Sequence, residues 1–211
     1  MPFTDHFYDR FVSKGFRSLE KQTLRPFPDE LRSFSVQQFV LNTVFCSPFE
    51  EKARARSFNV IRRTLNAVEE YDLARASYET IFPNKTVGAY LRALHHFESC
   101  VTELFQAFEL LFGMIGKKIP DKTTTGSEEI LFKLDRIYNT AKHTEHMLLR
   151  AQHFKEGDTL AVWISNAGLT SKSYTLTFDE LHESLCAIAN AAAMLANAGR
   201  QAAVHPVRNS A

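Results

Sequence analysis

Residues 87–113 read VGAYLRALHHFESCVTELFQAFELLFG, and this stretch decides the fold. Apolar residues recur in it every three or four positions, which is the period of an amphipathic α-helix. The stripe that results has one charged member, Glu98, and otherwise consists of Leu91, Leu94, Val101, Phe105, Phe108 and Phe112. Gly113 and Gly116 supply the expected stop. We therefore predict a long helix that packs through this stripe in a mainly α protein.

Helical spacing recurs on both sides of this stretch. Residues 49–82 predict a second long helix, which ends at Pro83 because proline disfavours helical geometry in the residue before it. Residues 127–152 predict a third helix after a polar loop. Near the N-terminus, residues 29–43 favour a further helix, although the prolines around it break the region up.

The period changes between residues 160 and 178. Residues 160–164 are β-like, Asn166-Ala167-Gly168 is a turn signal, and residues 174–178 alternate, so we expect a β-hairpin. An alanine-rich helix over 178–203 follows it. Thr177 and Glu180 are three residues apart at its start, which predicts a capping box.

These elements predict an antiparallel four- or five-helix bundle with a small β-hairpin before the last helix. Residues 1–48 are expected to form an N-terminal arm or short helices that pack on the bundle. The helical bundle covers 49–204, and 205–211 is expected to be a frayed tail.

Composition excludes several classes of function. Net charge is +1 over 211 residues, so a nucleic-acid contact would depend on a local patch. The three cysteines are far apart and predict reduced thiols in a cytoplasmic protein rather than a zinc site or disulfide framework. No apolar run is long enough to span a membrane. The 18 phenylalanines imply a bulky core or a covered apolar surface.

The segment from Asp135 to His146 carries the candidate chemistry. At about 100° per residue, its apolar residues fall in one sector, while Arg136, Asn139, His143 and His146 fall roughly opposite. A neutral histidine can take a proton from a ribose 2′-hydroxyl, which then attacks the adjacent phosphate. An arginine can hold that phosphate and stabilise its developing charge. This is metal-independent RNA cleavage, and it needs no cofactor.

The sequence resembles the Arg-x4–6-His motif of the HEPN superfamily at Arg136 and His143, which are separated by six residues. The motif lies late in a helical protein. The resemblance covers about residues 87–152, and the last helix loosely. It implies a homodimer with the motif at the dimer cleft, with RNA as ligand and an antitoxin or regulatory protein as a further partner. His143 would be the general base and Arg136 the phosphate ligand, with Asn139, Lys142 and His146 binding substrate. Ile137 departs from the family pattern, which usually has a polar residue directly after the arginine.

Three other interpretations stay open. The polar stripe could form a dimer contact in a non-catalytic interaction or regulatory protein. Histidines on two helices could bind a metal, although no Glu-x-x-His pair supports a di-iron site, and Asp179 with His182 comes nearest. A basic run from Lys52 to Arg63 could contact phosphates, although flanking glutamates favour intrahelical ion pairs. Glu98 is separately expected either to be a snorkelling residue at the edge of the bundle or, if buried, to need a partner, for which Arg136, His143 and His95 are the candidates.

Overall fold

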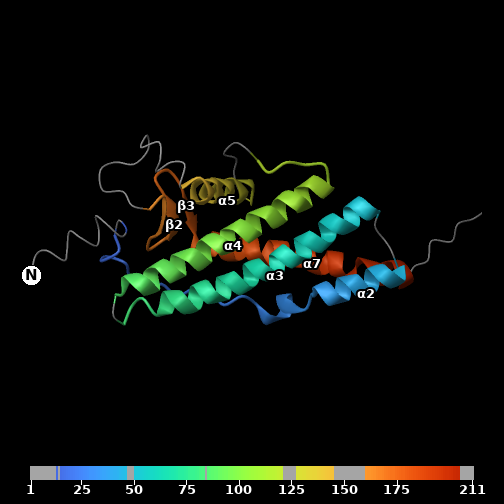
Figure 1. The fold of residues 1–211 in the computed structure, drawn as a ribbon, viewed down its shortest axis with the longest axis horizontal. Coiled ribbons are helices and arrows are strands. Elements are labelled where there is room, and N and C mark those ends of the chain that lie inside the picture. Colours follow the sequence, from blue (N-terminus) through green and yellow to red (C-terminus); the bar gives the residue numbers. More distant parts are fainter. Residues whose placement is uncertain are drawn as a thin grey trace, which may run out of the picture.

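The computed structural model describes residue 13 and residues 15–46, 50–83, 85–120, 127–144 and 160–204, and two long helices form its centre (Figure 1). Helices α3 (Glu51–Glu79) and α4 (Val87–Met114) lie side by side and run in opposite directions. Tyr71, Tyr78, Tyr90 and Phe97 are fully buried between the elements that meet here. The two long helices predicted from residues 49–82 and 87–113 are confirmed.

The stripe predicted for α4 is shifted from the observed core face. Leu94, Val101 and Phe105 are buried, but Leu91 is 44% exposed. The buried face is centred on small and aromatic residues between the predicted positions, because α4 packs on more than one neighbour. Gly113 lies inside the helix, so the stop comes from Gly116, whose φ is +70°. The amide of Lys117 donates to the Phe112 carbonyl (2.9 Å), which satisfies a terminal carbonyl.

Helix α7 (Phe178–Val204) packs on α3, and α2 (Val36–Cys46) packs on α7. The prediction of one helix over 29–43 is wrong, because a short 3-10 turn, η1 (Asp29–Arg32), precedes α2 and residues 33–35 separate them. The Ser35 hydroxyl accepts from the Gln38 amide (3.0 Å), so α2 has its own N-terminal cap.

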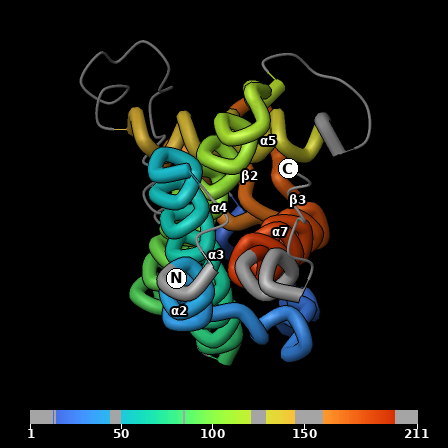
Figure 2. The backbone as a smooth tube through the Cα atoms, turned by 90° about the vertical axis from the view of Figure 1, so that its right-hand side faces the viewer, coloured from blue at the N-terminus to red at the C-terminus, as the bar shows by residue number. Residues whose placement is uncertain are grey.

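Helix α5 (Ser127–Lys142) lies on α4, on the side of the molecule away from α2 (Figure 2). The described part of the motif helix runs from Ser127 to Lys142, and residues 145–152 of the predicted helix lie outside the described residues.

The predicted β-hairpin is a three-stranded antiparallel sheet in the order β1 (Val162–Ile164), β2 (Gly168–Ser171), β3 (Thr175–Thr177). Local patterning does not predict the middle strand, because Asn166-Ala167-Gly168 is a turn signal although Gly168 pairs with Thr177. The capping box of α7 is confirmed: the Thr177 amide donates to Glu180 Oε2 (2.8 Å), and the Glu180 amide donates to Thr177 Oγ1 (3.1 Å).

The described part of the N-terminal segment, residues 15–35, runs over the helices and has no α-helix or strand before η1. Its apolar side chains belong to the core; they are Phe16, Leu19, Leu24, Phe27 and Phe34. Buried tyrosines of the helices fix its backbone, since Tyr71 donates to the Arg25 carbonyl (2.9 Å) and Tyr78 to the Glu20 carbonyl (3.2 Å). No helix among the described residues is long and apolar enough to cross a membrane.

Candidate functional site

Arg136 lies in the C-terminal half of α5, one turn after Phe132. Its guanidinium stacks over the Phe132 ring, with Cζ 4.7 Å from the ring centroid. Its Nε is 3.8 Å from Asp135 Oδ2, and 40% of the side chain is exposed. The stacking contact holds the guanidinium in a defined position while part of it stays accessible, which suits a phosphate ligand.

His143 is the first residue after α5 and its side chain is exposed. Its amide donates to the Asn139 carbonyl (3.1 Å), so the backbone continues the helical path for one more residue. Arg136 and His143 are seven residues apart, about two turns, and therefore lie on the same outward side of α5.

The other predicted site residues have mixed placements. Asn139 Nδ2 donates to Asp135 Oδ1 (2.7 Å), so this amide orients the aspartate next to Arg136 and not the histidine. Burial raises the pKa of Asp135, while Arg136 and Asn139 oppose that rise. Lys142 is exposed and its Nζ lies over the Tyr138 ring, 5.4 Å from the centroid. His146 lies outside the described residues.

The periodicity of α5 predicts a polar sector that is open to solvent along the helix. The structure shows that this sector is partly covered. Phe132 falls within that sector but is only 4% exposed. The Tyr174 ring, from the β2–β3 turn, meets Phe132 edge to face at 5.5 Å between centroids. On the flank facing α4, Tyr138 is buried and stacks on Phe105 at 4.3 Å. Phe132 and Tyr138 are thus covered, whereas the side chains of Lys142 and His143 at the C-terminal end of α5 are exposed.

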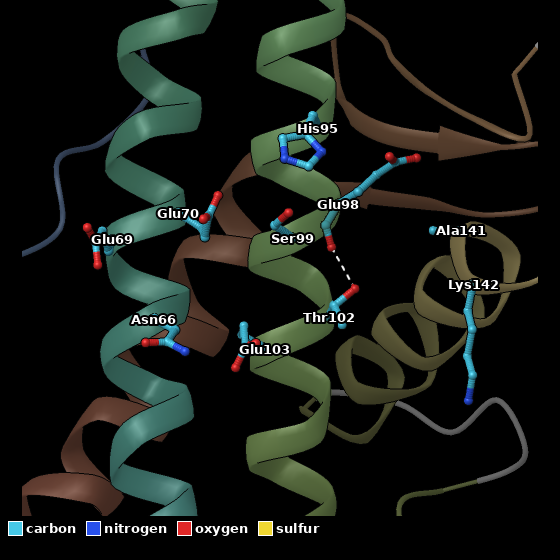
Figure 3. Close-up of a pocket in the computed structure, with 10 residues that line it drawn as sticks. All are labelled: Asn66, Glu69, Glu70, His95, Glu98, Ser99, Thr102, Glu103, Ala141 and Lys142. Atoms are coloured by element: carbon cyan, nitrogen blue, oxygen red, sulfur yellow. Dashed lines mark hydrogen bonds between the residues drawn. The ribbon is translucent and has the colours of Figure 1, made fainter. Parts of the chain in front are cut away.

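A second polar feature is a pocket of about 560 Å³ where α3 and α4 meet the end of α5 (Figure 3). It is lined by Asn66, Glu69, Glu70, His95, Glu98, Ser99, Thr102, Glu103, Ala141 and Lys142. Arg136 and His143 do not line it, so the pocket and the Arg136–His143 pair occupy different surfaces of α5.

Glu98 is the unusual member of this pocket. Burial raises its pKa to about 7, and its carboxylate has no hydrogen bond or ion pair within the described part of the chain. None of the three candidate partners, Arg136, His143 and His95, pairs with it, and its side chain is only partly buried. Its carboxyl group points from α4 toward the end of α5 (Figure 3).

Two other glutamates of the pocket are paired. Glu70 Oε2 is 2.8 Å from His96 Nδ1, and Glu103 Oε2 is 3.0 Å from Arg63 Nη1. Among the residues described, no three histidine, cysteine or acidic side chains are placed to hold one metal ion.

The remaining sequence candidates have structural roles. His182 is buried, with Nε2 3.2 Å from the Pro26 carbonyl, so it fastens the N-terminal segment to α7. In the basic run of α3, Arg56 donates to the Gly113 carbonyl (2.8 Å) and Arg63 pairs with Glu103 of α4. These two arginines therefore bind groups of α4. They do not form the predicted ion pairs with glutamates of their own helix.

Comparisons with protein-family models, with curated proteins and with solved structures find no match to this chain.

Proposed function

We propose that this chain is a cytoplasmic, HEPN-like RNA-binding protein that cleaves RNA without a metal ion. The proposal includes an antiparallel helical bundle and a homodimer that brings two motif helices together. The observation that carries it is the placement of Arg136 and His143 on one outward side of α5, with the guanidinium stacked on Phe132 and the imidazole exposed.

The two side chains divide the reaction between them. His143 takes the proton from a ribose 2′-hydroxyl as general base. The resulting oxyanion attacks the neighbouring phosphorus, the bond to the next nucleotide's 5′-oxygen breaks, and a 2′,3′-cyclic phosphate remains. Arg136 binds the phosphate oxygens and stabilises the added charge.

A twofold dimer would supply the leaving 5′-oxygen with a proton, because a second His143 would then face the first across the interface. Lys142, Asn139 and His146 are proposed as secondary substrate contacts, and an antitoxin or regulatory protein as a further partner. The alternative is a non-catalytic interaction protein in which the same outward side forms only the dimer contact.

The test is incubation of purified protein with mixed RNA in EDTA. We expect products with 2′,3′-cyclic phosphate ends, and a loss of roughly 10²-fold or more in His143→Ala because general-base catalysis contributes that much. Arg136→Lys keeps the charge but loses the two-pronged phosphate geometry, so it is expected to be impaired too.

His95→Ala is the matched control, because His95 is an exposed histidine of α4 that does not share the outward side of α5. Cleavage that persists in His143→Ala at the wild-type rate would overturn the catalytic assignment. Folded, dimeric wild-type protein with no cleavage would favour the interaction protein.

A further inference from the structure

Two stretches of the sequence without any charged residue or histidine fold next to each other. They are residues 33–49 and 184–199, the two longest such stretches in a chain of which 23% is charged. The first contains α2, and the second lies within α7. The two helices pack on each other at the end of the molecule away from the sheet (Figure 1). Two distant, uncharged parts of the chain therefore build one surface.

Side-chain hydrogen bonds fix these two helices against each other. Gln38 Nε2 donates to Asn197 Oδ1 (2.7 Å), and Asn42 Nδ2 donates to a backbone carbonyl of α7 (2.6 Å). Leu41 lies within one turn of both Gln38 and Asn42. Met194 lies within one turn of Asn197. Both apolar side chains are therefore close to the line along which α2 and α7 meet.

The outward side of this helix pair is apolar. Met194 is 73% exposed, the largest fraction among the large apolar side chains that the structure describes, and Leu41 is 57% and Val40 44% exposed. An exposed helix face is normally rich in charged residues. Here the other exposed side chains within the described parts of the two stretches are small or carry an amide; they are Ser33, Gln37, Ala187 and Asn190. Such a face is typical of one that a partner covers.

The absence of charge at this face fits a second copy of the chain. In a twofold contact the same patch is used on both sides, so a lysine or glutamate near the axis would face a like charge. Apolar side chains have no such conflict. An exposed amide such as that of Asn190 carries both a donor and an acceptor, so it can pair with its own counterpart. A strongly acidic or basic partner would find no opposite charge on this face.

We propose that the outward face of α2 and α7, centred on Leu41 and Met194, binds the same face of a second copy of this chain. The inference goes beyond the proposed function and does not depend on it, because α5 lies on the side of the molecule away from α2 (Figure 2). With the 11 residues of α2 as its length and two helices as its width, the contact buries on the order of 1,000 Å² in total. A contact of that size forms a weak, reversible dimer with a dissociation constant in the micromolar range.

Sedimentation equilibrium of the full chain over a concentration series tests this dimer. Leu41→Glu places two like charges in the contact, so we expect it to raise the dissociation constant at least about 10-fold, and Met194→Glu to do the same. Leu91→Glu is the matched control, because Leu91 is 44% exposed but lies near the start of α4. It is expected to associate as wild type does. Since all three positions are exposed, circular dichroism melts are expected to give each variant a Tm close to that of wild type.

The mass of the variant separates this contact from a dimer formed through α5. If the motif helices also associate, Leu41→Glu keeps that dimer and has half the mass of the wild-type assembly. If they do not, Leu41→Glu is a monomer and wild type a dimer. In both cases the association is expected to persist at high salt, which screens ion pairs and favours apolar burial.

Equal masses of wild type and Leu41→Glu at every concentration would overturn the second copy as the occupant and leave the face to a different partner. Association that Leu91→Glu weakens equally, or that high salt abolishes, would overturn it too. Wild-type protein that associates through Leu41 but cleaves no RNA would overturn the proposed catalysis alone.

Discussion

Glu98 places a carboxyl group in the polar pocket where α3 and α4 meet the end of α5, and burial there raises its pKa from 4.5 to about 7. Between these two values the folded protein keeps a proton that the unfolded chain releases. The free energy of unfolding therefore falls as the pH rises through this window. Glu98→Gln removes the ionisation, so we expect it to be more stable than wild type at pH 8, by on the order of 1–3 kcal/mol.

Urea unfolding at pH 5 and pH 8 measures this difference. The advantage of Glu98→Gln is expected to shrink at pH 5, where the folded wild-type carboxyl is protonated. Glu109→Gln makes the same charge change at an exposed position of α4 and is expected to show no such pH dependence. Equal shifts in both variants would mean that net charge, and not burial of Glu98, sets the trend.

Gly168 is required by the close approach of two strands. A Cβ added there would lie 2.1 Å from the Leu176 carbonyl oxygen of β3, and the backbone cannot move away without breaking the strand pair. We expect Gly168→Ala to lower the free energy of unfolding by roughly 1–3 kcal/mol. Gly88→Ala is the matched control, since nothing lies within 4 Å of its added Cβ, and alanine favours a helix. Circular dichroism melts that give the two variants the same Tm would contradict this assignment.

At the scale of elements, the capping box connects the sheet to α7 and to α5. Glu180 accepts from the Thr177 amide and also binds Lys133 of α5. Thr177→Ala is expected to cost about 1 kcal/mol, and Thr177→Ser to restore most of it. Chemical denaturation compares the three proteins, and a Thr177→Ser variant no better than Thr177→Ala would indicate that the methyl group, and not the hydroxyl, matters.

The same element has a pH dependence opposite to that of Glu98. Burial alone would raise the pKa of Glu180, but hydrogen bonds from Lys133 and Thr177 outweigh it and lower the pKa. The stabilisation is present above the ordinary value of 4.5 and is lost as the pH falls through the lowered folded value. We expect Glu180→Gln to be less stable than wild type at pH 7, with the difference shrinking in acid, measured by denaturation at both pH values.

Elements with a repeating apolar pattern were predictable from sequence, and elements fixed by tertiary contacts were not. The regular spacing in α3 and α4 extends over many turns, so the period is unambiguous. The middle strand has four residues and begins with Gly168, whose role depends on its partner Thr177. Local signals cannot show such a partner. The 3-10 turn before α2 was missed because its acidic and apolar residues also suit a helix start.

At the scale of the whole molecule, the candidate site was predictable only in part. The seven-residue spacing of Arg136 and His143 is a local property, and helical geometry was enough to place both on one side. Phe132 lies in the same sector but is buried, because Tyr174 arrives from a distant turn. The spacing of residues in α5 predicts neither the burial of Phe132 nor the position of the Tyr174 ring. Helical spacing identified the charged face, and the packing of the sheet determines how much of it a ligand can reach.

The hydroxyl of Tyr90 joins three distant parts of the molecule. It donates from α4 to Ser13 Oγ (2.7 Å) in the N-terminal segment and accepts from the buried amide of Ile164 in β1 (2.9 Å). Tyr90→Phe keeps the ring packed edge to face on Phe16 but removes the acceptor for the Ile164 amide. We expect a loss of about 1–3 kcal/mol in the free energy of unfolding, together with faster hydrogen exchange at the Ile164 amide. Tyr174→Phe removes a hydroxyl from an exposed ring and should change neither quantity. Wild-type stability and an equally protected Ile164 amide in Tyr90→Phe would mean that apolar packing alone holds the sheet against α4.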